Sequence, residues 1–163
     1  GSVADEDGHV ERGIRAMLDA FVSAVTIGDR VRDVLGELKR RGLKLGFLSN
    51  YSLAEAIHLS ARKVGIRDYF DAFVVSAELG LVKPHPELFR ETARRLGLEP
   101  GEILFVGDNP RADIAGAAAV GMRTAHITEH LDGRYHFEHP DEEFVEIRPD
   151  LTLSKLTDLL RGD

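Results

Sequence analysis

The chain has 163 residues, a net charge of −7 and no cysteine. A chain of this length buries roughly two-thirds of its unfolded surface, which is enough for one compact core. The lack of cysteine excludes a disulfide framework, and the intermixed charges offer no positive surface for nucleic acid. No apolar run approaches the ~20 residues of a membrane span, so we expect a soluble, cytoplasmic protein. Gly1-Ser2 resembles an expression scar and is set aside.

From Asp29 onward, amphipathic helices alternate with short apolar strands. Asp29 and Ser52 are suited to begin helices as N-caps, Pro86 fits a first helical turn, and Gly97 and Gly121 fit helix ends. Apolar residues recur at helical spacing, or in short runs, in eight segments. The expected helices cover residues 31–41, 53–64, 86–96 and 110–120, and the expected strands cover residues 43–48, 70–75, 103–106 and 123–127.

This alternation predicts an α/β fold, with a parallel sheet, right-handed crossovers and helices on both faces. Ligands of such sheets bind at the carboxyl ends of the strands, which directs attention to the residues just after each one. Residues 128–149 interrupt the pattern because they are polar, with one candidate strand at 144–147. A short terminal helix is expected around four leucines, Leu153, Leu156, Leu159 and Leu160.

Two carboxylates, Asp108 and Asp113, lie five residues apart at a strand-to-helix junction, where Gly107 lets the backbone turn sharply. Carboxylate oxygens beside a helix N-terminus suit a Mg²⁺ ion that keeps several waters and shares a bound phosphate. The alternative is that Asp108 only caps the helix that follows, which is a common role of aspartate.

Lys83 and the pair Ser49-Asn50 are the other candidates. A lysine beside clustered aspartates neutralises their repulsion and can contact a phosphate oxygen, and the prolines on either side of His85 could aim Lys83 inward. Ser49 and Asn50 follow an expected strand, where a hydroxyl and backbone N–H groups could hold a phosphate. The structural alternatives are a solvated surface lysine and an ordinary turn.

The order of these segments resembles the haloacid dehalogenase (HAD) superfamily, in its phosphatase and dehalogenase branch. Residues 45–50 are similar to the family's second motif, residues 76–89 to its third, and residues 105–113 with residues 116–122 to its fourth. The resemblance spans residues 29 to 127 and implies a Rossmann-like three-layer sandwich. It implies catalytic roles for Ser49, Asn50 and Lys83, and a Mg²⁺ site at Asp108 supported by Asp113.

The family's first motif, an apolar strand ending in Asp-x-Asp-Gly-Thr, is missing or degenerate. The only candidate, Asp5-Glu-Asp7-Gly-His9, lacks a preceding apolar strand and has His9 in place of threonine. Apolar residues of the next segment fit the last helix of a cap domain, so residues 1–28 are interpreted as a cap remnant and residues 29–163 as the core. The nucleophile is then either Asp5 or a residue upstream of the chain.

The missing strand should leave two neighbouring strands with unpaired backbone groups, which is costly. We therefore expect the N-terminal segment, a second copy of the chain or a separate polypeptide to complete the sheet. Four histidines lie in or near an acidic loop and are interpreted as solvated surface residues rather than metal ligands; they are His126, His130, His136 and His139.

Three functions follow from the resemblance. The first is a Mg²⁺-dependent phosphatase that acts on a small phosphate monoester through an aspartyl-phosphate. The second is an inactive or truncated domain that binds phosphate without turnover. The third is a haloacid dehalogenase, which needs no metal; the Gly-Asp-x4-Asp spacing favours the phosphatase.

Overall fold

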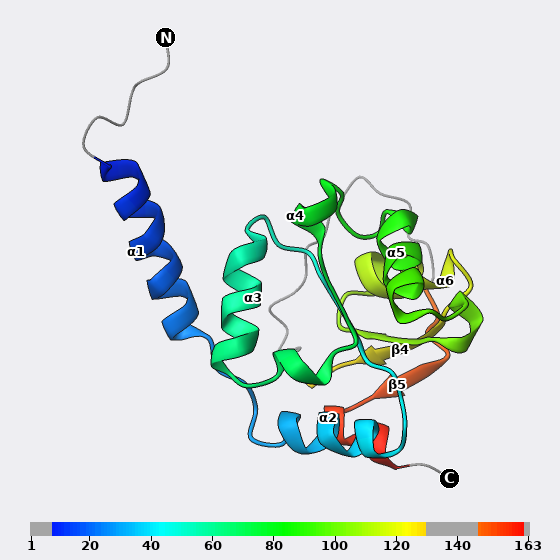
Figure 1. Cartoon of the computed structure of the whole chain (residues 1–163). Coiled ribbons are helices and arrows are strands. Elements are labelled where there is room, and N and C mark those ends of the chain that lie inside the picture. Colours follow the sequence, from blue (N-terminus) through cyan, green and yellow to red (C-terminus); the bar gives the residue numbers. More distant parts are fainter. Residues whose placement is uncertain (1–7, 130–146, 162–163) are drawn as a thin grey trace.

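The computed structural model describes residues 8–129 and 147–161. Helices and strands alternate along the chain (Figure 1). The α-helices are α1 (His9–Ala24), α2 (Val31–Arg40), α3 (Ala54–Lys63), α4 (Ser76–Leu79), α5 (Pro86–Leu96) and α6 (Gly116–Ala118). The strands are β1 (Gly46–Ser49), β2 (Ala72–Val75), β3 (Leu104–Gly107), β4 (Arg123–Ile127) and β5 (Leu151–Leu153). Four short helices are of other types. Three are 3₁₀ helices, η1 (Arg67–Tyr69), η2 (Pro100–Glu102) and η4 (Leu156–Leu160), and η3 (Pro110–Ala115) is a π-helix.

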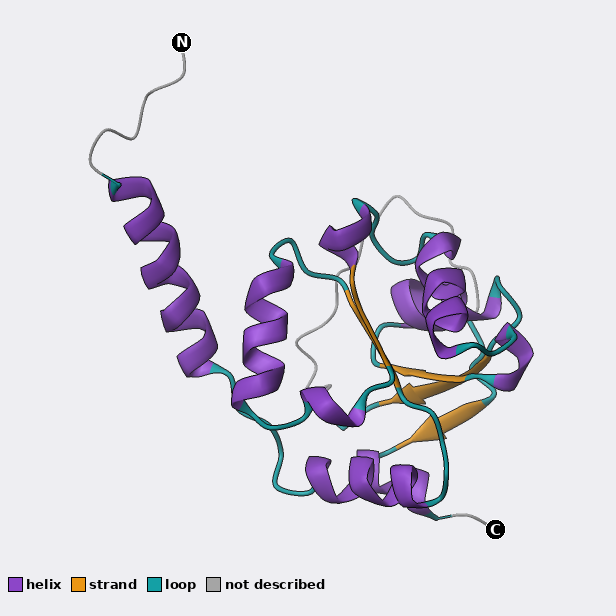
Figure 2. Cartoon of the chain, viewed as in Figure 1, coloured by secondary structure: helices purple, strands orange, loops and turns teal. Residues whose placement is uncertain are grey.

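Helices cover the strands on two sides, which gives the three layers that the sequence predicts (Figure 2). Along β1, successive side chains point to opposite faces. A Cβ at Gly46 would contact α5 at Leu96 and Thr92, whereas Phe47 packs with the cluster that contains Ala61 of α3. All strand pairs are parallel, as expected for a chain in which helices connect the strands.

Two apolar clusters form the core. Phe89 and Ala93 of α5 pack with Ala117 and Met122, and partly buried residues from β1 and β3 lie against them. The second cluster joins Ala61 to Phe73 and Val75, beside the stacked rings of Phe47 and Phe73. Because the first cluster contacts β1 as well as β3, one layer of side chains spans both sheets.

The strands form two sheets rather than one. β1 pairs with β2, and β3, β4 and β5 pair in that order, but among the described residues β1 and β3 share no ladder. Burial is unusual in the same place, because β1 and β3 are partly exposed while β2 is buried throughout. In a covered parallel sheet the central strands are normally the most buried. The structure thus has the interruption that the missing first motif leads one to expect.

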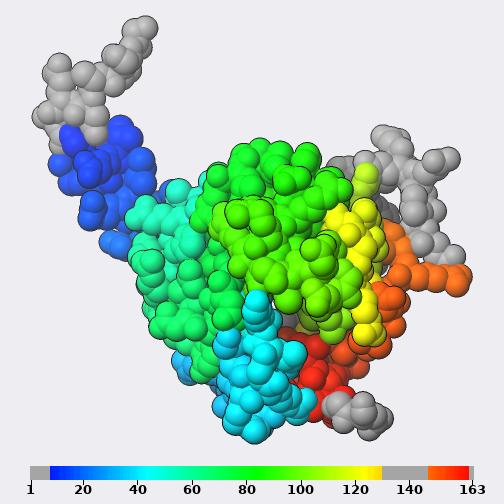
Figure 3. Space-filling view, turned by 45° about the vertical axis from the view of Figure 1, so that its right-hand side comes forward, coloured from blue at the N-terminus to red at the C-terminus, as the bar shows by residue number. Residues whose placement is uncertain are grey.

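Helix α1 extends away from the rest of the molecule, and Figure 3 shows it standing clear of the globular body. Its second half and its C-cap are attached to the body: Leu18 is buried, and Lys63 Nζ of α3 donates to the carbonyls of Ser23 (2.6 Å) and of the C-cap residue Val25 (3.1 Å). The helix that the sequence predicts here is present. The division into a cap remnant at residues 1–28 and a core at residues 29–163 stays a prediction.

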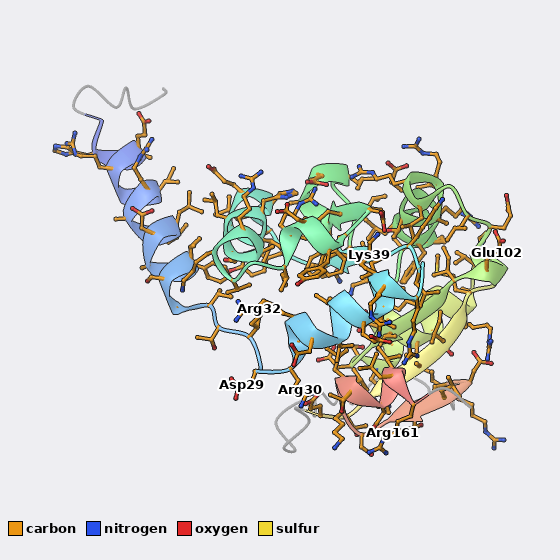
Figure 4. The ribbon with its side chains drawn as sticks, turned by 60° about the horizontal axis from the view of Figure 1, so that its bottom comes forward. Asp29, Arg30, Arg32, Lys39, Glu102 and Arg161 are labelled. Atoms are coloured by element: carbon orange, nitrogen blue, oxygen red, sulfur yellow. The ribbon has the colours of Figure 1, made fainter. Side chains whose placement is uncertain are left out.

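Several local expectations were wrong. Helices α2 and α3 begin after Arg30 and Leu53, so neither Asp29 nor Ser52 is the N-cap residue; Figure 4 shows Asp29 and Arg30 in the turn before α2. Leu153, which the leucine spacing placed in the terminal helix, belongs instead to β5 beside β4, whereas Leu156–Leu160 form the short 3₁₀ helix η4. Of the candidate strand at 144–147, residues 144–146 lie outside the described residues. Within the described part of the chain, no helix is long and apolar enough to cross a bilayer.

Candidate active site at the carboxyl ends of the strands

Lys83 lies at the centre of the candidate site. Its Nζ donates to Asp113 Oδ1 at 2.6 Å and to the Leu48 carbonyl oxygen at 3.4 Å, and it lies 5.8 Å from the centre of the Phe105 ring. The side chains of Lys83 and Asp113 are only 11% and 5% exposed. A buried ion pair of this kind is tolerated only when its remaining hydrogen-bonding groups also find partners. Lys83 therefore joins the end of β1 to the turn that follows β3.

Asn50 holds Lys83 in place. The Asn50 Oδ1 accepts from the Lys83 backbone N–H at 2.7 Å, and the Asn50 Nδ2 donates to the Lys83 carbonyl oxygen at 3.2 Å. This double contact holds the loop after α4 against the end of β1. Ser49, the last residue of β1, is partly exposed beside it. The structure thus brings Asn50 and Lys83 together, with Ser49 next to Asn50 in the chain and the Asn50 carboxamide occupied by protein backbone.

Asp113 has both carboxylate oxygens in hydrogen bonds. Besides the bond from Lys83, Asp113 Oδ2 accepts from the Asn109 backbone N–H at 3.1 Å. A Cβ added at Gly107 would lie 2.4 Å from the Asp113 Cβ, so only glycine lets the turn after β3 approach Asp113. Asp113 is consequently a support for Lys83 and for this turn, and its oxygens do not point freely into solvent.

Asp108 differs from Asp113 because it is exposed. Its backbone carbonyl oxygen lies 3.1 Å from His126 Nε2. The cap of η3 is the neighbouring Asn109, whose Oδ1 accepts from the backbone N–H groups of Arg111 (3.0 Å) and Ala112 (2.8 Å). The alternative that Asp108 only caps the following helix is therefore wrong. Sequence reasoning gave Asn109 no role, although an asparagine directly before a proline at the first helical position is a signal for a cap.

A metal at this site would find one exposed carboxylate. Among residues 8–129 and 147–161, no group of three or more acidic, histidine or cysteine side chains is arranged to hold a metal ion. Mg²⁺ commonly uses an open kind of site, with one or two carboxylates, several waters and the phosphate of a substrate.

Some candidates cannot be placed. Asp5 and Asp7 lie outside the described residues, as do His130, His136 and His139. His126 lies on β4, and its Nε2 is 3.1 Å from the Asp108 carbonyl oxygen. Among the described residues, Asp113 is the carboxylate that contacts Lys83, and each of its oxygens already accepts a hydrogen bond.

A family model described as haloacid dehalogenase-like hydrolase matches residues 3–121, which include Ser49, Lys83, Asp108 and Asp113. The chain belongs to the haloacid dehalogenase-like hydrolases. Two curated members are similar to it. Pyrophosphatase PpaX of Bacillus cereus (strain AH820) is 32% identical over 132 residues, which are 81% of this chain and 57% of that protein. Glyceraldehyde 3-phosphate phosphatase of Methanopyrus kandleri is 36% identical over 126 residues, which are 77% of this chain and 52% of that protein.

Solved HAD structures share the fold. A HAD phosphatase from Thermococcus onnurineus superimposes with a TM-score of 0.73 at 27% identity, covering 92% of this chain and 65% of that one. A 2-haloacid dehalogenase from Pseudomonas syringae pv. tomato DC3000 also gives a TM-score of 0.73, at 26% identity, covering 92% and 58%. This HAD chain therefore spans little more than half the length of the curated relatives it matches.

Proposed function

We propose that this HAD chain is the core of a Mg²⁺-dependent phosphatase that acts on a small phosphate monoester. The observation that carries the proposal is the position of Lys83, a nearly buried ammonium held between the end of β1 and Asp113. A fixed cation with little solvent around it attracts an anion more strongly than a surface lysine does. The relatives that carry curated names, a pyrophosphatase and a phosphatase of glyceraldehyde 3-phosphate, support a small phosphorylated substrate.

In this proposal the phosphate is bound by the chain's own polar groups. Lys83 neutralises charge on one phosphate oxygen, and the Ser49 hydroxyl donates to another. Asn50 acts through the Lys83 backbone rather than on the phosphate, because its carboxamide oxygen already accepts from Lys83 N–H. Asp113 keeps the Lys83 ammonium pointing inward. These groups contribute by positioning and charge neutralisation, which dominate catalysis of phosphoryl transfer.

The exposed carboxylate of Asp108 is the residue that would bind Mg²⁺. The fit is that of an open site, in which water and the phosphate supply most ligands. When bound, the ion would neutralise negative charge on the phosphate oxygens. Asp113 would support this site indirectly, through the Asn109 backbone N–H that holds the turn around Asp108.

Turnover also needs a nucleophile, which we propose comes from a further extended segment between β1 and β3. There an aspartate oxygen would attack phosphorus while the bond to the alcohol oxygen breaks and a second acid gives that oxygen a proton. Water would then hydrolyse the acyl phosphate, which releases phosphate and restores the carboxylate. The N-terminal segment with Asp5 and Asp7, a second copy of the chain and a separate polypeptide are the three sources to be distinguished.

The second candidate function is a domain that binds phosphate without turning it over. The interruption between β1 and β3 favours it for the chain on its own, because the strand that would present a nucleophile is not among the described residues. Several of the similar solved structures are dehalogenases, one of them at 26% identity, but the curated relatives are named as a pyrophosphatase and a phosphatase.

Hydrolysis of p-nitrophenyl phosphate with Mg²⁺ tests these functions in wild type, Asp5→Asn and Asp108→Asn. If the chain carries its own nucleophile, both substitutions should abolish turnover. If wild type shows no turnover but still binds inorganic phosphate with Mg²⁺, the binding function is correct for this chain. If wild type neither turns over the ester nor binds phosphate, both proposals are wrong.

A further inference from the structure

A cleft of about 520 Å³ opens beside Lys83. Its walls are the segment after β1, residues 50–52, and the segment after β2, residues 76, 77 and 80–82. Asn50 and Val82 connect it to the candidate site, because Asn50 bonds the Lys83 backbone and Val82 immediately precedes Lys83. The volume falls within the range of about 300–1,000 Å³ that is typical of small-molecule sites.

The described residues that line this cleft carry no charge. Serine, asparagine and tyrosine supply its polar atoms, and alanine, leucine and valine supply most of the rest. Glu78, the acidic residue of the same segment, is bound elsewhere, with one oxygen 2.7 Å from His58 Nε2 and the other 3.6 Å from Arg95. A group that enters the cleft therefore meets an uncharged surface next to the backbone of Lys83.

Tyr51 gives the cleft a fixed aromatic wall. The hydroxyl of Ser76, a residue that is 2% exposed, accepts from the Tyr51 backbone N–H at 3.0 Å and donates to the Tyr51 carbonyl oxygen at 3.2 Å. The Tyr51 ring also packs against the Phe21 ring of α1, with 5.1 Å between centroids. Val82 lies in the other wall of the cleft and is 64% exposed, although valine is among the residue types that are most often buried.

We propose that this cleft binds the alcohol part of the phosphate monoester, and that this part is an uncharged organic group with an apolar face. The inference rests on the proposed phosphate site and names the substrate class for it. An apolar group would cover the exposed Val82 side chain and contact the Tyr51 ring. A second phosphate in the same position would find no cation among the described lining residues to bind it. The site thus selects esters of neutral alcohols over pyrophosphate.

Binding of three anions in the presence of Mg²⁺ tests the inference by NMR titration of the whole chain. The three are inorganic phosphate, phenyl phosphate and pyrophosphate. Phenyl phosphate should bind about tenfold more tightly than inorganic phosphate, the gain expected for burying part of a ring. Pyrophosphate should show no such gain.

Val82→Lys is the decisive variant, since the side chain is exposed and the change places a cation in the cleft. It should reduce the preference for phenyl phosphate over phosphate and create one for pyrophosphate. Tyr51→Ala should also reduce the preference for phenyl phosphate. Val10→Lys is the matched control, because Val10 is 62% exposed on α1 and lies outside the cleft, so all affinity ratios should stay as in wild type.

The outcomes separate the two proposals. If phosphate binds but phenyl phosphate binds no more tightly, or if its advantage survives both cleft variants, the cleft proposal is overturned while the phosphate site stands. If phosphate itself does not bind, the proposed function fails and the cleft proposal fails with it.

Discussion

Lys83 and Asp113, thirty residues apart in the chain, form an ion pair of 2.6 Å that is almost closed to solvent. Because Asp113 also accepts from the Asn109 backbone, and Lys83 also donates to the Leu48 carbonyl, the pair connects the ends of two sheets that share no strand ladder within residues 8–129 and 147–161. The same contact therefore serves the architecture and the proposed phosphate site.

Removal of either partner should destabilise the chain strongly. Lys83→Met or Asp113→Asn leaves one buried group unpaired, and we expect each to lower the free energy of unfolding by about 3–5 kcal/mol. The double variant should cost clearly less than the two single changes together, because no buried charge is then left alone. Urea unfolding measures both effects. As a control, Glu11→Gln removes an exposed pair with Arg15 and should change stability by less than about 1 kcal/mol. Additive losses in the double variant would contradict the prediction.

Gly107 should not tolerate alanine. The added Cβ would approach the Asp113 side chain to 2.4–2.5 Å, so the turn after β3 or Asp113 must shift. We expect a loss of about 1–3 kcal/mol, with weaker phosphate binding as Lys83 is displaced. Gly13→Ala is the control, since Gly13 lies inside α1 with nothing within 4 Å of the added atom and should gain up to about 1 kcal/mol. Equal effects of the two changes in thermal unfolding would show that the close contact is unimportant.

Substitutions at the neighbouring residues Asp108 and Asn109 should separate the effect of ion binding from the effect of helix capping. Asn109→Ala removes the acceptor for two backbone N–H groups and should cost about 1 kcal/mol of stability. Asp108→Asn should leave stability nearly unchanged, because this exposed residue is not the cap, but should weaken Mg²⁺ binding in the presence of phosphate. Urea unfolding and a Mg²⁺ titration by NMR provide the two measurements. A large stability loss in Asp108→Asn would restore the capping interpretation.

The regular parts of the fold could be predicted from the sequence because their signals are local. The apolar runs before Gly107 and after Gly121 correspond to β3 and β4, and Pro86 begins α5 as expected. Strand β5 was missed because three residues are too few to show a period, and Leu153 also fits the helical spacing of the leucines that follow. The Asn109 cap was missed because Asp108 offers the same chemistry one position earlier. The contact between Lys83 and Asp113 has no local signal; the convergence of strand ends in a parallel sheet and the resemblance to the family suggested it.

Acid should weaken the attachment of β5. The backbone N–H of Thr124 and then its hydroxyl donate to Asp150 Oδ2, at 2.7 and 2.9 Å, and these bonds hold the pKa of Asp150 below its usual value. A carboxylate whose pKa is lower in the folded state contributes stability above its unfolded pKa, and this contribution disappears as the pH falls through the folded value. Unfolding followed between pH 7 and pH 2 should therefore show a smaller loss of stability for Asp150→Asn than for wild type. Parallel pH profiles for the two proteins would argue against this role of Asp150.

Hydrogen exchange should reveal the interruption between the sheets. Strands β1 and β3 each have a ladder partner on one side only among the described residues, whereas β4 is paired on both sides and β2 is fully buried. At low protein concentration, peptides that cover β1 and β3 should exchange faster than those that cover β2 and β4, because unpaired and partly exposed amides open more readily.

If a second copy of the chain fills the space between β1 and β3, protection of these two strands should rise with protein concentration. Protection that is high and independent of concentration, in a chain that sediments as a monomer, would mean that the chain's own N-terminal segment completes the sheet. If β1 and β3 become as well protected as β2 and β4 only at high protein concentration, a second copy of the chain supplies the strand that completes the sheet.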